Sequence, residues 1–170
     1  MIDKIVEHFE NQLNRVNTWL SFAEAKNAAL IAFNVAILGI GSNLFLSYPL
    51  GSTIIIFLLS ISCIISLLSF SPILISKAEN YNSIDSTTLN LIYFGDIAKL
   101  KDEIELINKT IERYYPQIDT ESIMSNKILD ISSEILINSR IAQRKYNFFK
   151  NALLLDIFTL ILFISFFIIA

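Results

Sequence analysis

The sequence is poor in the side chains that most catalytic and metal sites require. It has one histidine, His8, and one cysteine, Cys63, among 170 residues. A zinc site, a histidine-based triad or a cysteine nucleophile needs a larger set of these side chains. The four glycines, at positions 39, 41, 51 and 95, are too scattered for a phosphate-binding loop. We therefore predict no catalytic residue, no metal site and no enzyme activity.

Charge is almost absent from three long segments. Residues 28–47 contain no charged side chain, and twenty helical residues span roughly the 30 Å of a hydrocarbon layer. Residues 53–75 and 152–170 have a similar length, and their only ionisable group besides the Cys63 thiol is Asp156. The pattern predicts three transmembrane helices. The first follows 27 polar or amphipathic residues without a small-residue cleavage site, so we expect it to remain in the mature protein.

The basic residues are all on one side of these segments. The thirteen lysines and arginines precede the first segment or lie between the second and the third. The loop around Tyr48, Pro49 and Gly51 has none. Because basic residues near spans stay in the cytoplasm, we predict a cytoplasmic N-terminus, a cytoplasmic region 76–150, and a C-terminus that is periplasmic or extracellular.

The polar regions have helical periodicity. Residues 1–27 predict an amphipathic stalk helix that continues into the first span, because neither proline nor glycine interrupts it. Its predicted buried stripe is Ile2, Val6, Phe9, Leu13, Val16, Leu20 and Ala23. A second helix is predicted before Pro116, with a stripe of Ile97, Leu100, Ile104, Ile107, Ile111 and Tyr114. A third, capped by Asp119 or Thr120, has the stripe Met124, Ile128, Ile131, Ile135, Asn138 and Ala142 and runs into the last span.

The predicted fold class is an all-α membrane protein with three transmembrane helices, an N-terminal cytoplasmic stalk helix and a cytoplasmic helical bundle. Its parts are the stalk 1–27, the transmembrane hairpin 28–75, the cytoplasmic region 76–150 and the third transmembrane helix 151–170. A narrow apolar stripe on a stalk needs a partner helix, so we expect a homo-oligomer in contact with membrane lipid.

Basic residues at the ends of the predicted spans are the candidate ligand-binding residues. Arg140 and Arg144 lie one helical turn apart on a shared face, which suits a phosphate group, and Lys145 is adjacent. Lys26 stands at the matching place before the first span. These residues also suit a purely structural use, as interfacial anchors that contact anionic lipid head groups.

Two side-chain amides and one carboxyl group lie within the apolar segments: Asn34, Asn43 and Asp156. Polar groups at such depth face a bundle interior or a water-filled path, so these are candidate pore residues. We expect Asp156 to pair with Lys26 or Lys150 near the inner surface.

Three short motifs resemble those of the Pycsar-type transmembrane effectors of bacterial anti-phage defence. The first precedes and enters the first span, the second is central, and the third precedes the last span. They are Trp19-Leu20 with Phe22-Ala23-Glu24-Ala25-Lys26, Leu30 and Asn34; Asn90-Leu91-Ile92-Tyr93-Phe94-Gly95-Asp96-Ile97; and Arg144-Lys145-Tyr146. Glu24 stands where the family more often has Asp, and Leu91 where it often has Pro.

The resemblance implies an effector of the bacterial inner membrane that senses a nucleotide and then impairs the membrane. Family members answer to cyclic mononucleotides, and similar effectors serve systems such as Hailong, whose signal is an oligonucleotide. The signal would come from a cognate cyclase or nucleotidyltransferase and would activate or inhibit the effector. We therefore hypothesise a nucleotide-gated homo-oligomeric channel or pore that causes growth arrest or cell death, and we expect no binding of duplex nucleic acid. The alternatives are an ungated membrane scaffold and a holin-like constitutive pore.

Overall fold

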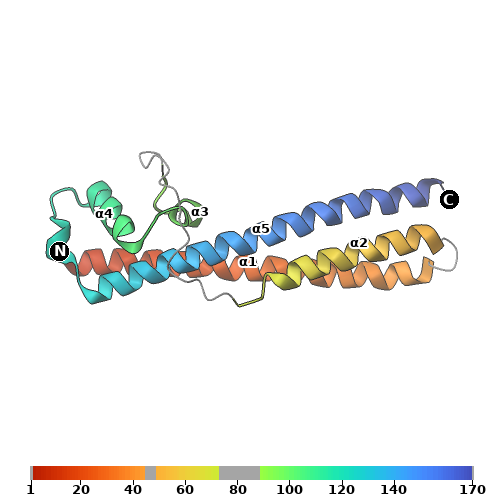
Figure 1. Ribbon diagram of the computed structural model, residues 1–170, viewed down its shortest axis with the longest axis horizontal. Helices are drawn as coiled ribbons and strands as arrows, with labels where there is room; N and C mark the ends of the chain where they lie inside the picture. Colours follow the sequence, from red (N-terminus) through yellow and green to blue (C-terminus); the bar gives the residue numbers. More distant parts are fainter. Residues whose placement is uncertain (1, 45–48, 73–88, 170) are drawn as a thin grey trace. The chain divides into compact units, whose positions relative to one another are not determined.

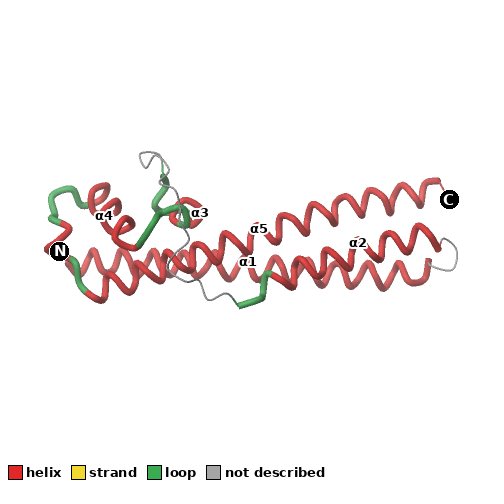
Figure 2. Tube along the Cα trace, in the orientation of Figure 1, coloured by secondary structure: helices red, strands yellow, loops and turns green. Residues whose placement is uncertain are grey.

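The computed structural model describes residues 2–44, 49–72 and 89–169, with the side chains of residues 41–44 and 166–169 left out of the description. Every regular element in these ranges is helical (Figure 2). The elements are α1 (Ile2–Leu44), α2 (Pro49–Leu68), α3 (Phe94–Ile97), α4 (Glu103–Tyr114), the 3-10 helix η2 (Thr120–Ile123) and α5 (Asn126–Ile169). The all-α prediction is confirmed.

Two of the helices are long and uninterrupted. α1 has 43 residues and α5 has 44, so the predicted continuation of each amphipathic helix into an apolar segment is confirmed. Three helices are long and apolar enough to cross a membrane: Ile2–Ile40, Pro49–Leu68 and Asn126–Ser165. These lengths and compositions are those of a multi-pass membrane protein.

The bounds of α2 differ from the predicted span 53–75. The helix begins at Pro49, since proline suits the first helical position, where its missing N–H costs no hydrogen bond. It ends at Leu68, and the backbone then turns through hydrogen bonds such as Phe70 N to Leu67 O at 3.0 Å. Pro72 follows within a few residues and cannot continue a helix. Residues 73–75 lie outside the described part of the chain.

Figure 1 labels the helices along the chain. The chain divides into two compact units, which we describe separately. The stalk unit comprises Met1–Ser21 and Ile73–Gln143, and the membrane unit comprises Phe22–Pro72 and Arg144–Ala170. Within the stalk unit, α1 and α5 run in the same direction. Glu10 pairs with Lys127 at 2.8 Å, and seven residues further along α1 the Asn17 side chain accepts a hydrogen bond from Asn138 at 2.9 Å.

The buried seam of α1 in the stalk unit only partly matches the predicted stripe. Phe9 and Val16 are buried as predicted, but Ile2 is 56% exposed. The other buried positions are Ile5 and Gln12 rather than Val6 and Leu13. Gln12 occupies a core position because its amide donates a hydrogen bond to the carbonyl of Leu91, which gives the buried polar group a partner.

The buried residues of α5 in the stalk unit also match the predicted stripe only in part. Ile128, Ile135 and Ala142 are buried as predicted, whereas Met124 is exposed. Ile131 and Asn138 are only partly buried, and Ser132 and Ser139 take their places at the alternating spacing of three and four. The predicted stripe did not include these small hydroxyl side chains, because it followed mainly the large apolar residues.

The helix predicted from Ile97 onward begins later than expected. Ile97 ends α3, and α4 begins at Glu103, where the Asp102 carboxylate caps it by accepting from the Glu105 amide at 2.8 Å. α4 ends at Tyr114, before Pro116, as predicted. The Asp119 carboxylate accepts from the Glu121 amide and so caps η2, while α5 starts at Asn126.

His8 lies among aromatic rings at the start of the stalk unit. Its ring centroid is 5.3 Å from that of Tyr114 and 5.8 Å from that of Tyr115. Burial, and secondarily the nearby Arg15 charge, lower the pKa of His8 below its usual value of 6.5. The folded stalk unit therefore holds this imidazole in its neutral form.

We expect the stalk unit to lose stability as the pH falls below about 6.5, because the unfolded chain then binds a proton at His8 before the folded chain does. The loss continues until the pH passes below the lowered folded pKa. Thermal unfolding measured across this range, for wild type and His8→Asn, checks the prediction. A variant whose unfolding depends on pH as strongly as that of wild type would contradict it.

Candidate functional site

The predicted ligand residues belong to different units. Arg140 lies in the stalk unit, whereas Lys26, Arg144 and Lys145 lie in the membrane unit. In the membrane unit, Lys26 comes from α1, and Arg144 and Lys145 come from α5. The structure thus brings three of the four predicted residues together in one unit.

The Arg140 guanidinium is occupied by the chain itself. Nη2 donates to the Leu100 carbonyl at 2.7 Å and to the Lys101 carbonyl at 3.1 Å. Nε lies 3.4 Å from the Ala98 carbonyl. These carbonyls belong to the turn between α3 and α4, so Arg140 holds that turn against α5. The geometry gives Arg140 a structural role in the stalk unit.

Arg140→Ala is expected to loosen this turn and destabilise the stalk unit by about 1.5–3 kcal/mol, since the partly buried bonds to the Ala98 and Leu100 carbonyls lose their charged donor. Hydrogen exchange at residues 98–102 should speed up. Arg140→Lys should rescue little, because an ammonium cannot reproduce the planar fork of donors. Unchanged exchange in the alanine variant would contradict the structural role.

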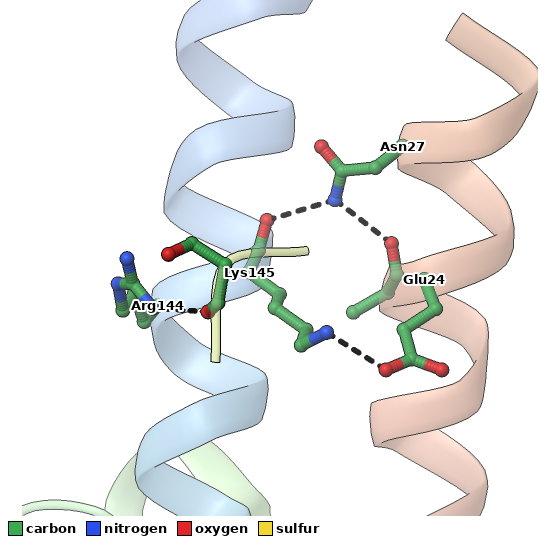
Figure 3. Close-up of polar contacts among 6 residues, drawn as sticks. Glu24, Asn27, Arg144 and Lys145 are labelled. Atoms are coloured by element: carbon green, nitrogen blue, oxygen red, sulfur yellow. Dashed lines mark hydrogen bonds and ion pairs between the residues drawn. The ribbon is translucent and has the colours of Figure 1, made fainter. Parts of the chain in front are cut away.

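In the membrane unit, α1 and α5 are joined by three residues that we call the clasp: Glu24, Asn27 and Lys145 (Figure 3). The Lys145 ammonium pairs with the Glu24 carboxylate at 2.7 Å. The Asn27 amide donates to the Lys145 backbone carbonyl at 3.1 Å and to the Ala23 carbonyl at 2.9 Å. The Lys145 side chain is 11% exposed and that of Glu24 is 48% exposed. A buried cation is therefore neutralised by a carboxylate that water can reach.

The other two basic residues lie over aromatic rings. The Lys26 ammonium is 5.0 Å from the Tyr146 ring centroid and 5.6 Å from that of Phe149. The Arg144 guanidinium is 4.9 Å from the ring centroid of Phe148. Aromatic rings beside cations are typical of the interface between membrane and water. Within the described membrane unit, neither Lys26 nor Arg144 pairs with a carboxylate.

The charge of this region favours an anion. The described residues of the membrane unit carry four basic side chains and two acidic ones. They are Lys26, Arg144, Lys145 and Lys150 against Glu24 and Asp156. Glu24 neutralises Lys145, and Asp156 lies deep in α5, so the end of the unit next to the clasp has an excess of positive charge. Such an excess attracts phosphate groups.

The intramembrane polar residues are buried where the three long helices pack. The Asn34 amide of α1 donates to the Ser62 hydroxyl of α2 at 3.0 Å. Ser62 in turn donates to the Ala152 carbonyl of α5 at 3.3 Å. Asp156 is 2% exposed and pairs with neither Lys26 nor Lys150, so that prediction is wrong. Asn43 lies in the last turn of α1, among residues whose side chains fall outside the description.

Sequence reasoning missed two members of the clasp. Glu24 was noted only as part of a motif, and Asn27 was not considered. Asn27 continues the spacing of four and three from Ala23 to Leu30 and Asn34, all of which are buried. The available signal was the position of Asn27, because a polar residue that follows the spacing of a buried stripe is itself expected to be buried.

The central motif, residues 90–97, forms a compact turn in the stalk unit. The Asn90 side chain accepts from the Ile92 amide at 2.9 Å, and the Asp96 carboxylate accepts from the Asn90 amide at 3.1 Å. A Cβ at Gly95 would lie 2.5 Å from a ring atom of Tyr93, so a larger residue there would displace this ring. The motif thus builds the fold of the stalk unit.

Comparison with protein families matches residues 8–170 to the Pycsar effector protein domain (PycTM). Comparisons with curated proteins and with solved structures found no match. The family match covers nearly the whole chain, including the three helices that are long and apolar enough to cross a membrane. The chain belongs to the Pycsar effector family, the membrane-associated effectors of anti-phage defence.

Proposed function

We propose that the chain is a nucleotide-gated effector of the bacterial inner membrane whose homo-oligomer forms a channel or pore. Its signal is a cyclic mononucleotide or an oligonucleotide made by a partner cyclase or nucleotidyltransferase. Family membership supports the response to a nucleotide. The excess of positive charge beside the clasp is the structural observation that supports binding of a phosphate there.

The proposed phosphate ligands are Lys26, Arg144 and Lys145. Lys26 and Arg144 have no carboxylate partner in the described membrane unit, so a phosphate would meet no competing anion at these two. Arg144 makes one long contact, from Nη1 to the Ser71 carbonyl at 3.5 Å, which a phosphate would replace. At Lys145 it would compete with Glu24, whose half-exposed carboxylate can move into water. Arg140 is left out of the site because its guanidinium already holds backbone carbonyls.

Gating follows from what the clasp does in the absence of ligand. Glu24 and Asn27 on α1 hold Lys145 on α5, so the clasp stabilises one packing of these helices. A phosphate that replaces Glu24 removes that restraint. A ligand shifts a conformational equilibrium only through a difference in affinity for the two states. The difference here is that Lys145 is available to the ligand only when the clasp is open.

Ion flux from liposomes tests this function. We expect purified protein to release a trapped ion only when one nucleotide from a panel of cyclic mononucleotides and oligonucleotides is added. Flux without any nucleotide would instead identify a constitutive pore. A protein that conducts no ions with the whole panel, yet retains a soluble partner from the host, would be a scaffold. Both of these outcomes contradict the proposal.

A further inference from the structure

Three buried side chains bring oxygen atoms together in the interior of the membrane unit. Each long helix contributes one: Asn34 from α1, Ser62 from α2 and Asp156 from α5. Asn34 and Ser62 are 0% exposed and Asp156 is 2% exposed. Asn34 donates to Ser62, and Ser62 donates to the carbonyl of Ala152, which lies one helical turn before Asp156 on α5. The cluster is therefore sealed within a packed helical core.

The cluster has more acceptors than donors. The Asn34 amide nitrogen and the Ser62 hydroxyl are already used, since they donate to Ser62 and to the Ala152 carbonyl respectively. Among the residues that the structure describes, nothing donates a hydrogen bond to Asn34 Oδ1 or to either oxygen of Asp156. Buried acceptors without donors are costly, and a carboxylate is the most costly of them. A positive group would satisfy all three.

The ligand set selects the kind of cation. Carboxylate, amide and hydroxyl oxygens are hard ligands that suit alkali and alkaline-earth ions rather than soft transition metals. The cluster carries one negative charge, from Asp156. A monovalent ion would make it neutral, whereas a divalent ion would leave a net charge in the membrane interior, which is unfavourable.

We propose that Asp156, Asn34 Oδ1 and Ser62 Oγ form a binding site for an alkali-metal cation such as Na⁺ inside the membrane unit. The site goes beyond the proposed nucleotide response, because it is occupied in the resting protein without any nucleotide. Since a metal requires the ionised carboxylate, protons compete with it and acid weakens binding. The bound ion stabilises the packing of the three helices around it.

Thermal unfolding of the full chain in nanodiscs tests the site. At about pH 8, where an ordinary carboxyl group is ionised, NaCl is compared with choline chloride at equal ionic strength. We expect NaCl to raise the Tm by on the order of 5 °C at a concentration about 100 times the dissociation constant. The rise should shrink as the pH is lowered. A wild-type protein whose Tm responds to pH but not to Na⁺ would overturn the site and leave Asp156 as a neutral acid.

Two serine variants provide a matched comparison. Ser62→Ala removes a ligand and should weaken the Na⁺ effect. Ser60→Ala should leave it unchanged, because the Ser60 hydroxyl donates to the Ile56 carbonyl of its own helix. Asp156→Asn should abolish the effect. If that variant does not fold, binding of radioactive sodium to the serine variants decides. Equal binding by Ser62→Ala and Ser60→Ala would overturn the proposal.

Discussion

Lys145→Met is expected to raise the nucleotide concentration needed for ion flux by about 10- to 150-fold. A hydrogen bond from a charged donor to a phosphate contributes about 1.5–3 kcal/mol, and methionine keeps the length and packing of the side chain while removing that donor. Lys145 is largely buried, so the variant loses no surface charge that acts from a distance. Flux from liposomes, titrated with the nucleotide that activates wild type, measures the shift.

Glu24→Gln should act in the opposite direction. It frees Lys145 from its partner without removing the ammonium, so the concentration needed should fall. Glu24→Asp keeps a carboxylate and serves as its control. Lys150→Ala removes an exposed positive charge from the same helix and controls for net charge. If Lys145→Met and Glu24→Gln changed the response in the same direction, Lys145 would be only a structural part of the clasp.

Cysteines introduced one at a time should fall into two classes, those that react in intact cells and those that react only after permeabilisation. With Cys63 replaced by alanine, a cysteine at Leu50, which is 82% exposed at the start of α2, should react with a membrane-impermeant maleimide in intact cells. A cysteine at Lys127, whose side chain is 61% exposed in the stalk unit, should react only after permeabilisation. The reason is that basic residues flank the spans on one side only.

The parallel course of α1 and α5 supports one part of this prediction, namely that both helices enter the membrane from one side. In the membrane unit, Glu24 pairs with Lys145, and further along both helices Asn34 of α1 bonds Ser62, which donates to the Ala152 carbonyl of α5. Two helices that run in the same direction enter the membrane from the same side. Reaction of the cysteine at position 127 in intact cells would contradict the orientation.

The long-range organisation could be predicted from the sequence because it depends on features that one segment carries alone. Hydrophobic length defined the three predicted spans, and the absence of proline and glycine from residues 1–27 predicted that this helix continues into the first span. Helix ends were less certain. α2 stops at Leu68 although the apolar run continues to residue 75, since a nearby Pro72 outweighs hydropathy.

The site was harder to predict because its residues acquire roles from partners far along the chain. Arg140 and Arg144 share a helical face in the sequence pattern, yet Arg140 binds the carbonyls of a turn some forty residues earlier. Gln12 is buried because Leu91 offers it a carbonyl. The spacing of apolar residues along a helix does not indicate which distant carbonyl a polar side chain will bond. Polar residues at seam positions therefore had to be located by the structure.

Equilibrium binding of nucleotides to the purified chain in nanodiscs tests the central claim most directly. The account predicts saturable binding of one signal nucleotide, weakened by salt because phosphate meets positive charge, and largely lost in Lys145→Met but kept in Lys150→Ala. Binding that is equal in wild type and Lys145→Met, or no binding of any cyclic mononucleotide or oligonucleotide tested, would contradict it.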